Sequence, residues 1–209
     1  MRMRAVPLAG VAAVLLAACS TDPITISPTS TTLLPAPTGQ VVVGPQSTPR
    51  GSPSAKPVND GTRCAVHVAD VRDVRLDPND LGMAGQRYVQ TIDSVAWLSG
   101  ALSSMKNDPR LRFVDNDDDA EFTLRIELVK AYIMTITTQK SANVVLRANY
   151  SRNGTAIDTQ IARGRDTGAN WANGSEEVQG ALNRALSAAV SELDNAIVTH
   201  CRASRIANR

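Results

Sequence analysis

The sequence predicts an α+β domain over residues 63–201, with a mainly antiparallel sheet of four to five strands and two helices packed on one face (β-α-β-β-β-β-α). Apolar and polar residues alternate along residues 120–133 and 141–150, as expected for strands with one buried and one wetted face. Apolar residues recur at helical spacing over residues 94–106 and 176–201. Helices that cover an antiparallel sheet from one side form the two layers of an α+β fold.

The first half of the domain is expected to contain two strands, a loop and a helix. Valines mark the first strand, and a cluster of Asp, Asn, Pro and Gly marks the loop that follows it. An Asp-Ser pair precedes the helix and supplies side chains suited to an N-cap. In order, the predicted elements are a strand at 64–74, a loop at 75–90, a helix at 94–106 capped by Asp93 or Ser94, and a short strand at 111–114.

The second half is predicted to be three sequential strands followed by one long helix. Asn153-Gly154 lies between two of the strands and favours a tight hairpin, because both residues tolerate positive φ. Asn173, with Glu176 three residues later, has the spacing of a capping box. The helical stripe that follows is dominated by Ala and Leu, which predicts close packing on the sheet.

The N-terminus has the pattern of a bacterial lipoprotein signal. Arg2 and Arg4 precede an apolar stretch of about 14 residues, too short for a membrane span of roughly 20 residues. The stretch ends in Leu-Ala-Ala-Cys, so residues 1–18 are predicted to be removed and Cys19 to carry lipid. The alternative is an ordinary signal peptide that is cut elsewhere, with Cys19 incidental.

Two segments flank the domain. Residues 19–62 are expected to form the lipidated N-terminus and a Ser/Thr/Pro-rich tether, because this composition buries too little apolar surface to fold. As a flexible coil the tether would reach about 35–40 Å. Residues 202–209 are expected to be a basic tail.

Cysteine content and charge restrict the function. With Cys19 lipidated, Cys64 and Cys201 remain as a pair in an oxidising compartment, which predicts a disulfide; the alternative is two buried free thiols. Removal of the signal takes away two arginines and leaves 20 basic and 20 acidic residues. A neutral chain gives no indication of nucleic-acid binding.

Motifs for chemistry are weak. The acidic run Asp115–Asp119 resembles the start of a calcium loop, but Ala120 stands where the turn needs glycine, so a solvated turn is expected. His67 and His200 lie close in sequence to Cys64 and Cys201, and a zinc site there competes with the disulfide. No nucleophile motif or phosphate-binding glycine loop is present. We therefore expect no metal, no cofactor and no catalysis.

Several segments resemble small envelope lipoproteins of Gram-negative bacteria: the lipobox, Asp70-Val-Arg-Asp-Val-Arg75, Trp97-Leu98 and Asp119–Leu128. That group includes uncharacterised outer-membrane lipoproteins, auxiliary lipoproteins of ABC-type lipid transporters and the lipopolysaccharide-assembly lipoprotein. The resemblance implies a non-catalytic role in envelope assembly or lipid trafficking. It also implies delivery to the outer membrane, since Ser20 follows the lipidated cysteine. The long tether and the cysteine pair depart from the usual form.

We therefore expect a lipid-anchored, periplasm-facing accessory or assembly factor that binds another envelope protein. The alternatives are a carrier or sensor of an apolar ligand such as a lipid, and an enzyme. The polar sheet face is expected to mix charge without converging it. Residues 133–140 are predicted to form a hairpin tip that could pair with the edge of a partner's sheet, with Ile133, Met134 and Ile136 as candidate contacts.

Overall fold

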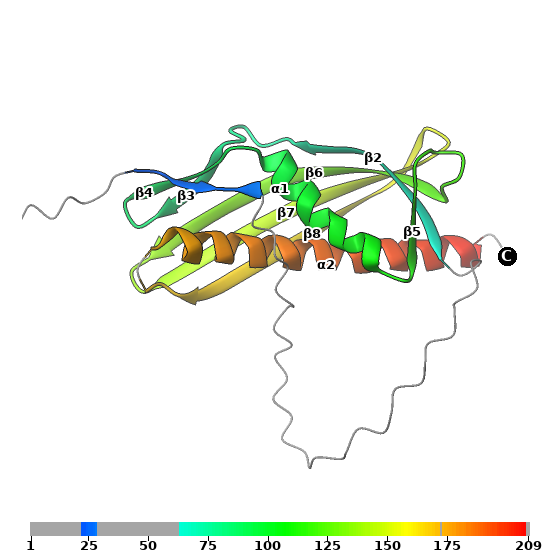
Figure 1. Ribbon diagram of the computed structural model, residues 1–209. Coiled ribbons are helices and arrows are strands. Elements are labelled where there is room, and N and C mark those ends of the chain that lie inside the picture. Colours follow the sequence, from blue (N-terminus) through cyan, green and yellow to red (C-terminus); the bar gives the residue numbers. More distant parts are fainter. Residues whose placement is uncertain (1–21, 29–62, 172, 208–209) are drawn as a thin grey trace, which may run out of the picture.

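The computed structural model describes residues 22–28, 63–171 and 173–207, which form a mixed eight-stranded sheet with helices α1 and α2 on one face (Figure 1). The α+β class is confirmed, whereas the expected four- to five-stranded, mainly antiparallel sheet is wrong. The elements are β1 Ile24–Ile26, β2 Cys64–Asp73, β3 Asp80–Ala84, β4 Arg87–Thr91, α1 Ser94–Leu102, the 3-10 turn η3 Ser103–Asn107, β5 Leu111–Val114, β6 Phe122–Ile136, β7 Gln139–Arg152, β8 Thr155–Ala169 and α2 Ser175–Ala207.

Strand β6 is the centre of the sheet. One edge of β6 pairs antiparallel with β7, which pairs antiparallel with β8. The other edge pairs in parallel first with β2 and then with β3. β5 extends the sheet beyond β2, and β4 and β1 extend it beyond β3. Parallel neighbours need crossover connections, and the segment through α1 supplies the one between β2 and β6.

A buried arginine holds the point where β6 changes partner. The guanidinium of Arg75 donates to the carboxylate of Asp73 at 2.7 and 3.0 Å, to the carbonyl of Asp80 at 2.6 Å and to that of Ala131 at 3.3 Å. The Ser94 hydroxyl donates to the same carboxylate at 2.6 Å. Burial acts to raise the pKa of Asp73, but the bonds from Arg75 and Ser94 hold it below its ordinary value.

The stretch predicted as a loop at residues 75–90 contains the β3–β4 hairpin. Gly85 takes a φ of 64° in the turn, a conformation that glycine adopts without a steric penalty. Gly82 has a φ of 96°, and a Cβ there would lie 2.3 Å from the carbonyl oxygen of Ile133. Glycine therefore lets β3 lie against β6, and the turn-forming residues that predict a loop serve two short strands.

Helix α2 covers the sheet as predicted. Its 33 residues lie across β8, β7 and β6, and its Ala and Leu side chains are buried against them. Gly164 of β8 marks the closest approach, because a Cβ there would lie 1.8 Å from the carbonyl oxygen of Ala185. None of the described helices has the length and apolarity needed to cross a membrane.

The local signals have mixed outcomes. The Asp93 carboxylate caps α1 by accepting from the Ala96 amide at 2.8 Å, as predicted. Asn153 and Gly154 both have positive φ in the β7–β8 turn, which confirms that hairpin. The capping box at Asn173 is wrong: α2 begins at Ser175, and no hydrogen bond to the Asn173 Oδ1 atom is found in the described part of the chain.

Residues 22–28 belong to the sheet, although their composition places them in the predicted tether. β1 runs parallel to β4 with Ile24 opposite Val89, and both isoleucines of β1 are buried. Their Ile-Thr-Ile alternation is a strand pattern that the surrounding Ser, Thr and Pro obscure. The signal, Cys19 and residues 29–62 lie outside the described residues.

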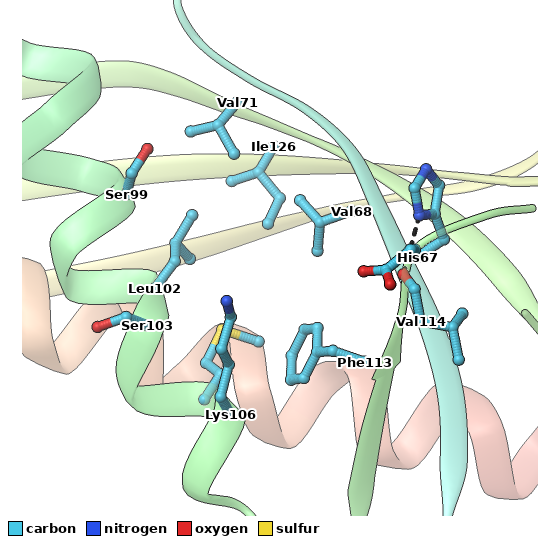
Figure 2. Close-up of a pocket in the computed structure, with 12 residues that line it drawn as sticks. His67, Val68, Val71, Ser99, Leu102, Ser103, Lys106, Phe113, Val114 and Ile126 are labelled. Atoms are coloured by element: carbon cyan, nitrogen blue, oxygen red, sulfur yellow. Dashed lines mark hydrogen bonds between the residues drawn. The ribbon is translucent and has the colours of Figure 1, made fainter.

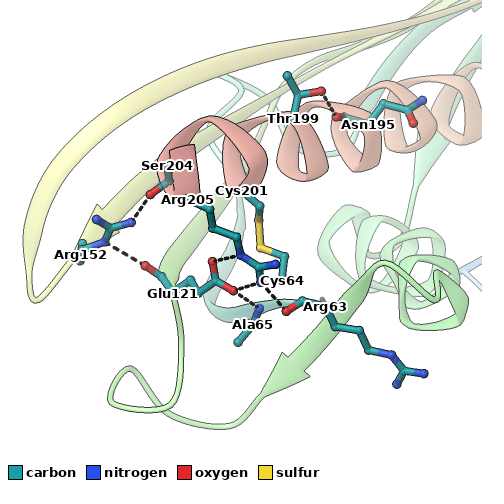
Figure 3. Close-up of a disulfide and its surroundings, with 10 residues drawn as sticks. All are labelled: Arg63, Cys64, Ala65, Glu121, Arg152, Asn195, Thr199, Cys201, Ser204 and Arg205. Carbon is teal, nitrogen blue, oxygen red and sulfur yellow. Dashed lines mark hydrogen bonds and ion pairs between the residues drawn. A yellow bond between two sulfur atoms is a disulfide. The ribbon is translucent and has the colours of Figure 1, made fainter. Parts of the chain in front are cut away.

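The predicted disulfide joins Cys64, at the start of β2, to Cys201 on α2, with their Cα atoms 6.0 Å apart (Figure 3). Beside it, Arg205 donates to the Glu121 carboxylate at 3.0 Å and to the carbonyl of Arg63 at 2.6 Å. Burial acts to raise the pKa of Glu121, and the bonds from Arg205 and the Ala65 amide lower it below its ordinary value. These bonds explain why the expected basic tail continues α2 as far as Ala207.

The disulfide should supply a large share of the stability. Replacing Cys64 and Cys201 together by Ala should lower the free energy of unfolding by about 2–5 kcal/mol, because the bond closes a loop with a sequence separation of 137 residues. Urea unfolding followed by circular dichroism measures the change. Reducing agent should lower the wild type to the level of the variant and leave the variant unchanged. Equal stability of the two proteins under oxidising conditions would contradict the prediction.

The closeness of α2 to β8 is testable with a matched pair of glycines. Gly164→Ala should destabilise the domain by at least about 2–3 kcal/mol, because its Cβ meets backbone atoms of α2. Gly174→Ala should change stability by less than about 0.5 kcal/mol, because nothing lies within 4 Å of its Cβ position. Thermal unfolding of both variants measures the two stability changes. Similar effects of the two substitutions would argue against the close packing of α2 on β8.

Candidate functional site

The sheet face opposite the helices is rich in arginine. The register places Arg125 opposite Asn149, and Glu127 opposite both Arg147 and Arg72. Outward-pointing residues alternate with buried ones along β2, β6, β7 and β8, and we call the charged part of this surface the basic face. It has six cations and two anions: Arg72, Arg125, Lys130, Arg147, Arg163 and Arg165, with Asp70 and Glu127.

Glu127 is the centre of the basic face. It is only 3% exposed and accepts from Arg72 Nε at 3.0 Å and from Arg147 Nε at 2.5 Å. Asp70 extends the network, with its carboxylate 3.4 Å from Arg125 and 3.8 Å from Arg72. Burial acts to raise the pKa of Glu127, and the two arginines lower it below its ordinary value. Charge therefore does converge on this face, contrary to the expectation from sequence.

The excess of cations on the basic face contrasts with the neutral sequence after the predicted cleavage. Opposite charges pair across β2, β6 and β7, whereas Arg163 and Arg165 add two cations on β8. A concentrated positive field attracts acidic groups and raises their rate of association. The arrangement therefore suits an acidic partner.

Strand β8 offers an edge beside the basic face. Within the described residues its 15 residues pair only with β7, so the opposite edge has no neighbouring strand. Glu192 of α2 covers one position by accepting from the Arg163 amide at 2.8 Å. Ile161, two residues before Arg163, is exposed, and so is Ile157 farther along the same strand. An open edge with apolar side chains is a template for an added strand.

The predicted contact residues at the β6–β7 tip divide between the two faces. Ile133 is 1% exposed and belongs to the core, so its prediction as a partner contact is wrong. Met134 and Ile136 are 44% and 61% exposed and point outward. The cause is a bulge between Leu128 and Lys130, which exchanges the inner and outer faces of β6 beyond it. A role for Met134 and Ile136 in partner contact stays a prediction.

A separate cleft lies on the helix side of the sheet, between β2, β5 and the α1–η3 segment (Figure 2). It has a volume of about 320 Å³, near the lower limit for small-molecule sites. Lys106 supplies a cation and Asp115 an anion among mainly apolar walls. The apolar lining includes Val68, Val71, Leu102, Phe113 and Ile126.

The histidines do not gather at the disulfide as the predicted zinc alternative requires. His200 stacks on Tyr150 with ring centroids 4.5 Å apart and lies 3.4 Å from the Asp158 carboxylate. His67 pairs with Asp117 at 3.6 Å. Ligand atoms of Cys64, Cys201 and Glu121 lie within 4.8 Å of one another, but the two sulfurs are bonded and Glu121 binds Arg205. Thiolates, the form that binds metal, are not available there.

Comparison with known proteins supports the fold. A Xanthomonas campestris protein of family DUF330 superposes with a TM-score of 0.51 at 11% identity, covering 68% of this chain and 88% of that chain. A minor lipoprotein from Acinetobacter baumannii has a TM-score of 0.42 at 12% identity, covering 64% and 93% of the two chains. Lipoprotein GNA1162 from Neisseria meningitidis has a TM-score of 0.36 at 11% identity, covering 63% and 99%.

The last two scores are too low to support an argument, and the first shows a shared fold alone. The sequence matches no protein-family model and no curated protein.

The network around Glu127 should give a defined pH dependence. Glu127→Gln should lower the free energy of unfolding by about 1–3 kcal/mol at pH 7, because it weakens the charge-assisted hydrogen bonds from Arg72 and Arg147. The folded-state pKa lies below the reference value of 4.5, so the wild-type advantage is complete above that pH and is lost as the pH falls through the folded-state pKa. Urea unfolding at pH 7 and below pH 4 measures it. A difference independent of pH would contradict the prediction.

Proposed function

We propose that the chain is a lipid-anchored, non-catalytic accessory or assembly protein of the bacterial outer membrane, which binds an acidic region of another envelope protein in the periplasm. The observation that carries the proposal is the basic face with the open β8 edge beside it. The bonds around Glu127 hold two arginines in place, so a partner need not order them on binding. Main-chain pairing at the edge and charge pairing on the face would act together.

The anchoring part of the proposal rests on the lipobox that ends at Cys19, and the choice of membrane rests on Ser20. The non-catalytic part rests on the positions of reactive groups in the described residues. Cys64 and Cys201 are bonded to each other, and both histidines lie beside aspartates at separate places in the fold. This arrangement supports binding over turnover.

A carrier of an apolar ligand is the second candidate, and the cleft beside Lys106 favours it. Its mainly apolar lining suits part of an acyl chain, and the lysine suits an anionic headgroup. The cleft and the basic face lie on opposite sides of the sheet. The two functions therefore respond to different substitutions.

Charge reversal on β8 separates the two candidates. A photo-crosslinking residue in place of Ile161 should give a protein adduct in intact cells, and Arg163→Glu with Arg165→Glu should abolish the adduct because they reverse the attracting charge. The control Arg202→Glu, at an exposed position of α2, should leave the adduct unchanged. Crosslinking and mass spectrometry identify the product.

Two results would count against the binding proposal. An adduct that survives the β8 charge reversal would place the interface elsewhere. Phospholipid that co-purifies with the wild type and is lost in a Leu102→Arg variant, without any protein adduct, would favour the carrier.

A further inference from the structure

We propose that the end of the domain formed by the β3–β4, β6–β7 and β8–α2 connections lies directly on the lipid surface, with Tyr88, Ile136 and Trp171 in the headgroup layer. We call it the membrane end. The inference rests on the proposed lipid anchor at Cys19. In this arrangement the Ser/Thr/Pro-rich stretch is not a spacer between the lipid anchor and the domain.

The position of β1 carries the first step. The described chain begins at Asp22, whose carbonyl accepts from Arg87 Nε at 2.9 Å. Arg87 is the first residue of β4, next to the β3–β4 turn. Cys19 precedes Asp22 by three residues, which span at most about 10–11 Å when fully extended. A lipid on Cys19 therefore brings this turn close to the membrane.

Two further connections meet at the same end, opposite the C-terminal end of α2 that carries Cys201 (Figure 1). The Gly85 amide of the β3–β4 turn donates to Thr135 Oγ1 at 2.6 Å, next to the β6–β7 turn. The Asn170 amide donates to the Thr138 carbonyl at 2.8 Å, which brings the start of the β8–α2 connection to that turn. These bonds fix the three connections as one surface.

Exposed apolar side chains gather on this surface. Met83 pairs with Tyr88 on one side and with Met134 on the other, so the apolar group is continuous across three strands. Both strongly exposed aromatic side chains of the described residues, Tyr88 at 61% and Trp171 at 86%, lie here. Aromatic side chains with a polar atom suit the boundary between headgroups and hydrocarbon. The structure therefore supplies a lipid-compatible surface where the anchor requires one.

The order of the elements along the chain supports the same orientation. Residues 29–62 connect β1 to β2 and do not separate Cys19 from the folded domain. Helix α2 starts at the membrane end and, with 33 residues, extends about 50 Å at 1.5 Å per residue. The disulfide end is thus the part that projects into the periplasm. We therefore assign lipid as the binding partner of the membrane end, because the covalent anchor at Cys19 would hold the bilayer next to it.

Quenching by brominated phospholipids tests this orientation. The full-length lipidated protein, reconstituted in phosphatidylethanolamine–phosphatidylglycerol vesicles, carries Trp171→Phe and one new tryptophan. Ile136→Trp reports from the membrane end and Ile206→Trp from the disulfide end, and both sites are already exposed. Buried Trp97 gives the same background in both. We expect bromolipid to remove more than half of the Ile136→Trp emission and to leave the Ile206→Trp emission unchanged.

Vesicle flotation separates this inference from the anchor itself. Protein that floats with vesicles but keeps its Ile136→Trp emission would overturn the orientation and leave the anchor intact. Equal quenching of both reporters would mean that the domain lies on its side, and would also overturn the orientation. Lipidated protein that floats no better than a Cys19→Ala variant would overturn the anchor, and the proposed function with it.

Discussion

Helix α2 is the constraint on which the rest of the described fold depends. Its small side chains let it lie against β8 at Gly164, where only a residue without a Cβ fits. From that position it also contacts β7, β6, α1, η3 and β1. Asn183 accepts from the Trp97 indole of α1 at 2.8 Å, and Gln179 donates to the carbonyl of Ser27 beside β1 at 3.0 Å. Its C-terminal part carries Cys201, which holds β2. If a methyl group at position 164 pushed α2 away from the sheet, all these contacts would be strained together.

Periodicity predicts the second half of the domain because each element there pairs with its neighbour in sequence. The β6–β7–β8 meander and α2 follow from local alternation and helical spacing, and the disulfide follows from cysteine count and compartment. The β3–β4 hairpin does not, because Gly82 in β3 and Gly85 in the turn are both loop-forming residues, and their place in a hairpin depends on contact with β6. β1 is hidden for a similar reason: three residues with a strand pattern stand in a Ser/Thr/Pro-rich segment. No local sequence pattern predicts the parallel pairing of β2 with β6, because the two strands are far apart in the sequence.

The candidate site was the least predictable part, and one bulge explains much of that. Uninterrupted alternation from Phe122 would bury Met134 and Ile136 and expose Ile133. The register shift after Leu128 reverses this and adds apolar side chains to the outer face. Polar alternation predicts an exposed face but not which charges meet on it. The convergence of Arg72 and Arg147 on Glu127 needs the register of three strands.

The distribution of charge along the outer face allows lipid and protein to act on different parts of it. Both acids, Asp70 and Glu127, lie in the rows far from the membrane end, whereas Lys130, Arg163 and Arg165 occupy the rows nearer to it. At about 3.3 Å per residue, Lys130 lies roughly 13 Å from Met134 and Glu127 about 23 Å. The Debye length is about 8 Å at physiological ionic strength, so an anionic lipid surface is largely screened at the row of Lys130 and Arg163 and acts mainly on Arg165, which lies two residues nearer to Met134. The Glu127 network lies beyond that range. Arg163 and the arginines around Glu127 therefore remain accessible to an acidic protein partner while the membrane end contacts the lipid.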